Sequence, residues 1–445
     1  MSISTRRALY GAALLLTIGS EADARCDRFV ASTMDVGVSP VAAWRTDYPD
    51  SSGNAPTPWL QHDFATDPQA YMAAVLSTVR AHFRADGNRL VGTGAEPWWI
   101  SEWMDYDLPG REPLMGLTKE RGPRNGDLSP VSIRGPQVWA VGFYNQSGAV
   151  TFGEIFADPC QPSVPEKVLF AEGAAAIKFL FSDANLGKFA GQVPYLDGAP
   201  IYDAHIDPEG VSGAAPIQNR SNRKVQLLQL DIAIKDDRAT KTGWVFGTFA
   251  WVGPKTGDGL FDNLVPVSLA WANDAGATTD NITESWINAS LEGKLFGWAA
   301  RPHLGFLGRA NGPADNIRSS CLSCHAAART PRSDRGLLGS GFNLSDLNNP
   351  AKVKAHVDVW FQNIMAGEVF DPTNPPAVAA LDYSLQLEAA IDRACLACKD
   401  GAFDGPTPPI CKAAGFHTEP TCRQLSLMSV VISQENRADR PLPRQ

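Results

Sequence analysis

Three residues near position 320 have the types and spacing of a cofactor attachment site. The stretch "CLSCH" places Cys321, Cys324 and His325 in a Cys-x-x-Cys-His pattern, which is the attachment signature of c-type haem. Two thiols on one helical turn reach the two vinyl groups along one porphyrin edge, and the next residue then lies under the iron. The pattern predicts one covalently attached haem c, with thioethers from both cysteines and an iron ligand from His325.

The competing interpretation of "CLSCH" is a thioredoxin-like redox pair, or a disulfide beside an incidental histidine. A redox pair of that kind follows a strand in a βαβ setting. Here the motif follows a stretch rich in Gly, Pro and Ala, residues 299–317, and precedes two predicted helices. The setting therefore favours haem attachment.

The ligand on the opposite side of the iron is left open by the sequence. Met365 follows the motif by a few tens of residues, as a methionine ligand commonly does in small c-type cytochromes, and His356 competes from the same predicted helix. Core packing would also explain Met365, and a solvated edge position would explain His356. A thioether ligand raises the reduction potential relative to a second imidazole, whereas an open position would admit small ligands.

A near-copy of the motif, "CLACK", occupies residues 395–399. A second haem with Lys399 as its ligand, as in cytochrome c nitrite reductases, is one interpretation, and a zinc site is another. Cys395, Cys398, Cys411 and Cys422 also form a C-terminal cluster that can pair in three ways. Because small segments in oxidising compartments are often held by disulfides, we expect disulfides here and a single haem in the chain.

Helices are expected around the motif. "NPAKVKAHVDVWFQNIMAG", residues 349–367, has Asn349 as its cap, Pro350 at its first position and Gly367 at its end. "ALDYSLQLEAAIDRA", residues 380–394, predicts a second helix. Far upstream, residues 66–84 predict a helix that Asp67 caps. These patterns make the region after residue 300 mainly helical.

The region from 137 to about 273 has a period of two. In "LQLDIAIK", Leu228, Leu230, Ile232 and Ile234 alternate with Gln229, Asp231, Ala233 and Lys235, and "GWVFGTFAWVG" and "LVPVSLAWAN" are apolar on both faces. Repeated short strands without intervening helices favour an antiparallel β-sandwich or jelly roll. We expect a multi-domain α+β chain: a mainly β region at 25–300, a small all-α haem domain at 301–393 after a linker, and a Cys-containing tail at 394–445.

The first 24 residues read as a cleaved signal peptide. Basic "MSISTRR" precedes the apolar "ALYGAALLLTIG", and "ADA" ends at Ala24. No later apolar run reaches the ~20 residues that a bilayer requires, so no membrane span is expected. The net charge of −9 and the lack of a Lys/Arg-rich run argue against nucleic acid as a partner. A periplasmic location follows, and there Cys26 and Cys160 could form a disulfide.

Two further stretches carry clustered polar side chains. "AEPWWISEWMDYDLPGRE" sets Trp98, Trp99, Trp103 and Tyr106 among acidic residues, which suits a ligand surface, although core packing is the favoured explanation. "YDAHID" places His205 between Asp203 and Asp207. We interpret that triplet as a turn with surface charges rather than a metal site.

The chain resembles the bacterial c-type cytochromes through "CLSCHAAA" and the two helices that follow, over roughly residues 312–393. "GREPLMGLTKERG", "VWAVGFYN", "TGWVFGTFAWVG" and "LVPVSLAWAND" are similar to exported cytochrome c family proteins that have no assigned activity. The resemblance implies haem, iron and electron transfer with a redox partner protein or a small-molecule donor or acceptor. The alternatives are a haem-dependent oxidoreductase whose β region binds a small-molecule substrate, and a non-redox ligand-binding protein with a haem sensor.

Overall fold

The computed structural model describes the parts of the chain that form the folded body. They are residues 41–42, 47–53, 56–86, 89–92, 97–102, 118–120, 122–123, 127–128, 135–206, 221–257, 259, 261–295, 305–332, 342–370, 378–401, 405–416 and 419–422. The predicted signal peptide, residues 1–24, and Cys26 lie outside these ranges.

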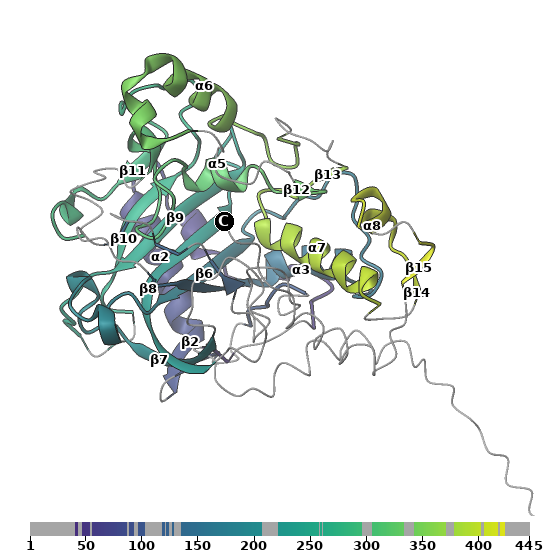
Figure 1. Ribbon diagram of the computed structural model, residues 1–445, viewed down its shortest axis with the longest axis horizontal. Coiled ribbons are helices and arrows are strands. Elements are labelled where there is room, and N and C mark those ends of the chain that lie inside the picture. The colour runs from purple at the N-terminus through teal and green to yellow at the C-terminus, as the bar shows by residue number, and fades with distance from the viewer. Residues whose placement is uncertain are drawn as a thin grey trace, which may run out of the picture.

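A large antiparallel sheet organises these residues (Figure 1). Its eight strands follow the spatial order β11-β10-β9-β8-β6-β5-β4, and β7 pairs with the first part of β8. The strands are β4 (Thr118–Lys119), β5 (Val138–Tyr144), β6 (Ala175–Ser182), β7 (Ile201–Ile206), β8 (Ser221–Lys235), β9 (Trp244–Trp251), β10 (Leu264–Ala270) and β11 (Ser285–Ile287).

Short strands form three small sheets beside the large one. β1 (Val41–Ala42), β2 (Phe83–Asp86) and β3 (Arg89–Gly92) form one, and two-stranded pairs join β12 (Arg329–Thr330) to β13 (Ala379–Ala380) and β14 (Gly405–Pro406) to β15 (Thr421–Cys422). The α-helices are α2 (Pro68–His82), α3 (Gln146–Ile155), α5 (Cys321–His325), α6 (Pro350–Trp360), α7 (Leu385–Lys399) and α8 (Pro409–Ala413). Single 3₁₀ turns lie at Pro58–Gln61, Gly187–Phe189, Pro194–Leu196, Ala289–Leu291, Phe306–Gly308 and Leu344–Asn348.

Helix α2 forms where the sequence predicted a helix. Asp67 caps it by accepting a hydrogen bond from the Ala70 amide, and Pro68 takes the first position. Tyr71, Val75 and Val79 are buried and belong to the same core cluster as the sheet. The prediction for residues 66–84 is confirmed within two residues at either end.

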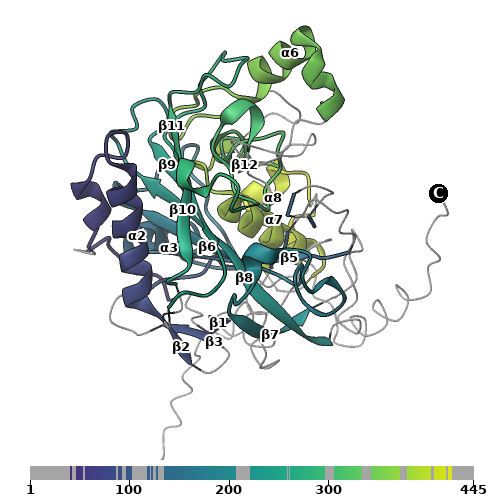
Figure 2. The ribbon, with the colours of Figure 1, turned by 90° about the vertical axis from the view of Figure 1, so that its left-hand side faces the viewer.

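Both faces of the large sheet are covered. Figure 2 shows α2 on one side of the sheet and α7 with α8 on the other. Phe143 and Phe179 point into the cluster under α2, whereas Tyr144 and Phe246 pack in a second cluster with Leu387 of α7. This double coverage explains why every residue of β5 and β9 is buried and why their sequences are almost continuously apolar. Within the described residues the large sheet is therefore covered by helices on both faces and does not face a second large sheet, as the expected β-sandwich would require.

The expected boundaries after residue 300 need correction. α7 runs through the boundary placed between residues 393 and 394, and it packs on the large sheet, so the described segment from 305 to 422 is not a separate all-α unit. α6 ends at Trp360, seven residues before Gly367. The second predicted helix begins at Leu385, after its Ser384 cap, rather than at residue 380.

The expected linker is firmly packed where the structure describes it. Arg309 is 2% exposed and donates hydrogen bonds to the carbonyls of Asn273 (2.7 Å), Asp274 (2.8 Å) and Ala277 (2.9 Å). Its guanidinium also lies over the Phe361 ring, 4.3 Å from the centroid. These contacts join the loop after β10, the motif segment and the end of α6, so the motif segment is held against the sheet.

The buried hydrogen bond between Tyr71 and Asp236 offers a test of how α2 is fixed. The Tyr71 hydroxyl donates to Asp236 Oδ2 over 3.1 Å, and both side chains are buried. A hydrogen bond to a charged group contributes about 1.5–3 kcal/mol, so Tyr71→Phe should lower the free energy of unfolding by about that amount. Urea denaturation measures it. Thr78→Ala on the same helix is the control, because its local bond to Ala74 is only partly buried; equal losses in the two variants would contradict this account.

Candidate cofactor site

A cavity of about 350 Å³ lies between the second face of the sheet, α5 and the first turns of α7. Cys321, Cys324 and His325 all line it. Figure 1 shows α5 at the end of β9 and α7 beside the sheet, so the cavity walls come from segments that are far apart in sequence. Its lining combines apolar side chains with polar and charged ones from several segments.

Helix α5 presents the two thiols. Ser320 caps the helix, and its hydroxyl accepts from the Ser323 amide while the Ser323 hydroxyl accepts from the Ser320 amide. Both cysteines are free thiols. Burial raises the pKa of Cys324 to about 12 and that of Cys321 well above its usual value. A redox-active thiol needs a lowered pKa, so the site does not favour a thioredoxin-like pair.

The imidazole of His325 is held in one tautomer. Its Nδ1 lies 2.9 Å from the Tyr383 carbonyl oxygen. Because a carbonyl can only accept, Nδ1 carries the proton and Nε2 keeps a lone pair. Burial lowers the pKa of His325 to about 4, which keeps the ring neutral near pH 7. Metal-binding histidines characteristically donate their second ring N–H to a carbonyl or carboxylate in this way.

The Tyr383 carbonyl is in turn fixed by an unusual backbone segment. Asp382 and Tyr383 both have positive φ, 46° and 66°, a region that non-glycine residues seldom occupy. Asp382 is buried and accepts from Trp244 Nε1 (2.9 Å) and from the Phe170 amide (2.8 Å). The Tyr383 hydroxyl donates to the Ile364 carbonyl over 2.6 Å. Through these bonds the sheet positions the imidazole.

The sheet floor of the cavity is built in two rows that cross four strands. In the first row Ala176 and Ala233 lie between Tyr144 and Phe246, and the Phe246 ring is 4.7 Å from that of His325. The two alanines leave space that larger side chains would fill. Two residues further along each strand, about 7 Å away, the second row consists of Gly142, Lys178, Asp231 and Thr248. Of these four residues, Lys178 and Asp231 line the cavity.

The second row brings charge into the cavity. Asp231 Oδ1 accepts from Gln229 Nε2 (2.9 Å) and Thr248 Oγ1 (2.8 Å), and Oδ2 lies 4.0 Å from Lys178 Nζ. Lys178 Nζ also lies 3.9 Å from Glu120. Burial, and next the nearby Asp315, raise the pKa of Asp231 to about 7, while Lys178 opposes the shift. An acid–base group that titrates near neutrality therefore lines the same cavity as the motif.

The structure does not bring either proposed sixth ligand to the cavity. Met365 is 42% exposed and is not among the cavity-lining residues. His356 lies in an aromatic cluster, stacked on Phe342 at 4.4 Å, and its Nε2 is 2.9 Å from the Arg318 carbonyl. Among the described residues that line the cavity there is no methionine and no histidine besides His325.

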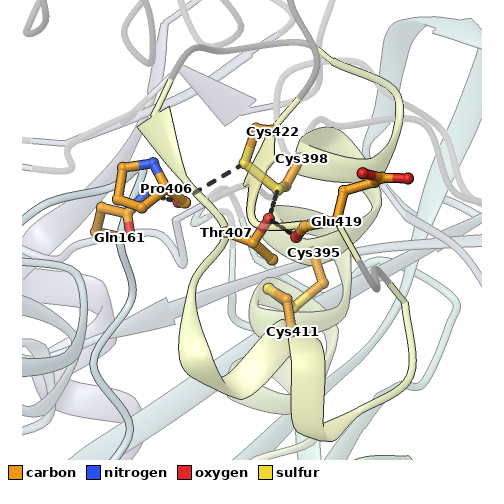
Figure 3. The surroundings of a disulfide bond; sticks show 8 residues. All are labelled: Gln161, Cys395, Cys398, Pro406, Thr407, Cys411, Glu419 and Cys422. Atoms are coloured by element: carbon orange, nitrogen blue, oxygen red, sulfur yellow. Dashed lines mark hydrogen bonds between the residues drawn. A yellow bond between two sulfur atoms is a disulfide. The ribbon is translucent and has the colours of Figure 1, made fainter.

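The near-copy "CLACK" lies at the end of α7 and is closed by disulfides. Cys395 pairs with Cys411 and Cys398 with Cys422, as Figure 3 shows. Thiols consumed in disulfides cannot form thioethers, and Lys399 is exposed, so the structure contradicts a second haem at this position. Cys160 is also disulfide-bonded, but its expected partner Cys26 lies outside the described residues.

The remaining candidate residues from the sequence do not line the cavity, or they lie outside the described ranges. Trp98 and Trp99 are buried, and Trp99 Nε1 donates to the Asp47 carbonyl, which agrees with core packing; Trp103 and Tyr106 are not described. "YDAHID" is not a turn, since residues 201–206 form strand β7. Nothing is described of the His205 side chain or of Asp207. Over the described ranges no group of three or more His, Cys, Asp or Glu side chains could hold a metal ion.

Several cavity residues were missed in the sequence, although a signal for two of them exists. Lys178 and Asp231 are charged positions inside strands that are otherwise apolar, and such a charge in a doubly covered strand points to a polar cavity. The alternation in β8 suggested a core face and a polar face without showing what covers the polar one. Asp382 and Tyr383 carry no sequence signal, because their role depends on backbone conformation.

Comparison with family models, with curated proteins and with solved structures found no significant match to this chain. The structure itself shows an α+β fold with a large antiparallel sheet. Within the described ranges no helix is long and apolar enough to cross a membrane. The two C-terminal disulfides are the kind of link that persists in an oxidising compartment.

A double-mutant cycle tests the link between the sheet and the segment that holds His325. Trp244→Phe and Asp382→Ala should each lower the free energy of unfolding. The loss in the double variant should be smaller than the sum of the two single losses, because both substitutions remove the same Trp244–Asp382 hydrogen bond. We expect a coupling energy of about 0.5–3 kcal/mol from urea denaturation. Strictly additive losses would show that the Trp244–Asp382 bond does not join the two segments.

Proposed function

We propose that this chain is an exported, monohaem c-type cytochrome that transfers electrons through haem c bound in the cavity. The observation that carries the proposal is that Cys321, Cys324 and His325 line one cavity, with His325 Nε2 left as a ligand by the bond at Nδ1. Free thiols on α5, an apolar wall and a neutral imidazole suit a porphyrin and its iron. The predicted signal peptide and the disulfides support maturation in a periplasm.

The β region supplies the second wall of the haem site in this proposal. Ala176, Ala233 and Phe246 give an apolar surface opposite α5, and no separate substrate module is required. Arg332, after β12, and Arg393, of α7, both line the cavity, and guanidinium groups suit the carboxylates of a haem. Arg332 also pairs with Glu388 over 3.1 Å.

The haem would supply a one-electron Fe(III)/Fe(II) couple, and the protein's own residues determine its setting. Cys321 and Cys324 would hold the porphyrin through thioether bonds. Tyr383 orients the imidazole of His325 and strengthens it as a donor. The apolar and charged residues that line the cavity would tune the reduction potential of the iron.

A second candidate function is a haem-dependent oxidoreductase that binds small ligands. The specific observation in its favour is that Met365 and His356 lie away from the cavity. A haem held by His325 alone would keep one position open, and an open position admits small ligands.

Haem stoichiometry tests the attachment site. Protein matured in a periplasm should contain one haem by pyridine haemochrome assay and intact mass. Cys321→Ala with Cys324→Ala should abolish covalent attachment. The matched control, Cys398→Ala with Cys422→Ala, should keep one haem while lowering the free energy of unfolding by about 3 kcal/mol. A full haem content in the first variant, or a loss in the control, would contradict the proposal.

Met365→Leu tests the open position. If the second candidate function is correct, the ferric absorption spectrum should be high-spin and the same in wild type and variant, because Met365 is exposed and does not line the cavity. Ultraviolet–visible and electron paramagnetic resonance spectra measure the spin state. A low-spin wild type that becomes high-spin in Met365→Leu would instead make this residue the ligand and restore the simple electron carrier.

A further inference from the structure

The row formed by Lys178 and Asp231 crosses the floor of the cavity without a role in haem attachment. Gly142, Lys178, Asp231 and Thr248 face one another in register across β5, β6, β8 and β9. This row lies on the same face as Phe246, which contacts His325. A charged pair inside a covered sheet is costly to bury, so its placement in a cofactor cavity calls for a function.

The two oxygens of Asp231 have different surroundings. Oδ1 accepts both hydrogen bonds, from Gln229 and from Thr248, which fix the orientation of the carboxylate. Oδ2 lies 4.0 Å from Lys178 Nζ, beyond direct hydrogen-bond distance. About 22% of the Asp231 side chain is exposed, and the residue lines the cavity. The carboxylate is therefore held rigidly, with Oδ2 able to take a proton from a molecule in the cavity.

We propose that Asp231 and Lys178 form an acid–base site that accepts the proton of a small weak acid, of the hydrogen peroxide or hydrogen cyanide class, as its anion binds in the cavity. The proposal rests on the second candidate function above, a haem that His325 alone holds and that keeps one position open. The H–X bond would break, the proton would pass to Asp231 Oδ2, and the iron of a bound haem would take up the anion X⁻. Lys178 keeps its positive charge, so the bound anion replaces the carboxylate as its counter-charge. No electron is transferred in this step, and no further reactant is needed.

The charges around Asp231 come from every wall of the cavity. They are Lys178 of β6, Glu120 after β4, Asp315 of the segment before α5, Arg332 after β12, and Glu388 and Arg393 of α7. Cys321, Cys324 and His325 of α5 are titratable groups that are neutral near pH 7. Asp231 has a raised pKa, near 7, in this setting. Below that pH the carboxyl is protonated and cannot accept a proton; above it, the carboxylate is the base.

Cyanide association with the ferric, haem-loaded protein is the experiment. Stopped-flow absorption from pH 5 to 9 should give a rate that rises through a pKa near neutrality and then levels. General-base assistance is typically worth about 10²–10⁴-fold, so Asp231→Asn should slow binding about 100-fold at pH 8 and flatten the profile. Asp231→Glu should restore part of the rate. Asp236→Asn is the control, because Asp236 is paired with Arg238 and Tyr71 and does not line the cavity.

A second measurement does not depend on a variant that folds. Infrared difference spectra of the wild type should show the carbonyl stretch of a protonated carboxylic acid appearing when cyanide binds, and the band should shift with isotope-labelled aspartate. If no such band appears, the proposal fails. It also fails if Asp231→Asn binds cyanide with an unchanged pH profile, or if Lys178→Gln converts a low-spin wild type into a high-spin form, because Lys178 would then be the iron ligand. Failure to load haem at all would instead overturn the proposed function.

Discussion

The hydrogen bond between His325 Nδ1 and the Tyr383 carbonyl is the contact on which the candidate site depends. It joins α5, which carries the motif, to the segment before α7, and Asp382 in that segment is bonded to Trp244 and Phe170. The imidazole therefore has one tautomer and one orientation, both set by residues of the sheet. Without this bond the motif would offer a histidine whose lone pair could point elsewhere.

The two faces of the large sheet differ: one packs an apolar core, and the other lines the cavity. On the α2 side its strands pack an apolar core around Phe143, Phe179 and Ile232. On the other side the small side chains of Ala176 and Ala233 leave room for the cavity, and the row that contains Lys178 and Asp231 gives it charge. The N-terminal region and the motif segment thus line one cavity together.

The residues that line the cavity bear on which of the two proposed functions a bound haem would serve. An electron carrier commonly holds its iron between two strong ligands, whereas a ligand-binding haem keeps one position open and places acid–base groups nearby. The described lining has His325 as its single histidine, no methionine, and a fixed carboxylate with a pKa near 7. These features place the proposed acid–base role of Asp231 and the proposed haem attachment in one cavity, with different residues responsible for each.

The sequence by itself predicted helix α2 and the antiparallel strands, and it contains the "CLSCH" motif. Helix caps, period-two alternation and the fixed spacing of a motif are all local patterns. It did not predict that α7 and residues 305–320 cover the second face of the sheet, since nothing local tells a covered polar face from a solvated one. The tertiary structure decided that "CLACK" is closed by disulfides, that Met365 is exposed, and that Asp231 lines the cavity with His325. The physical reason is that a side chain's partners across a sheet or a cavity come from segments distant in sequence, and only packing brings them together.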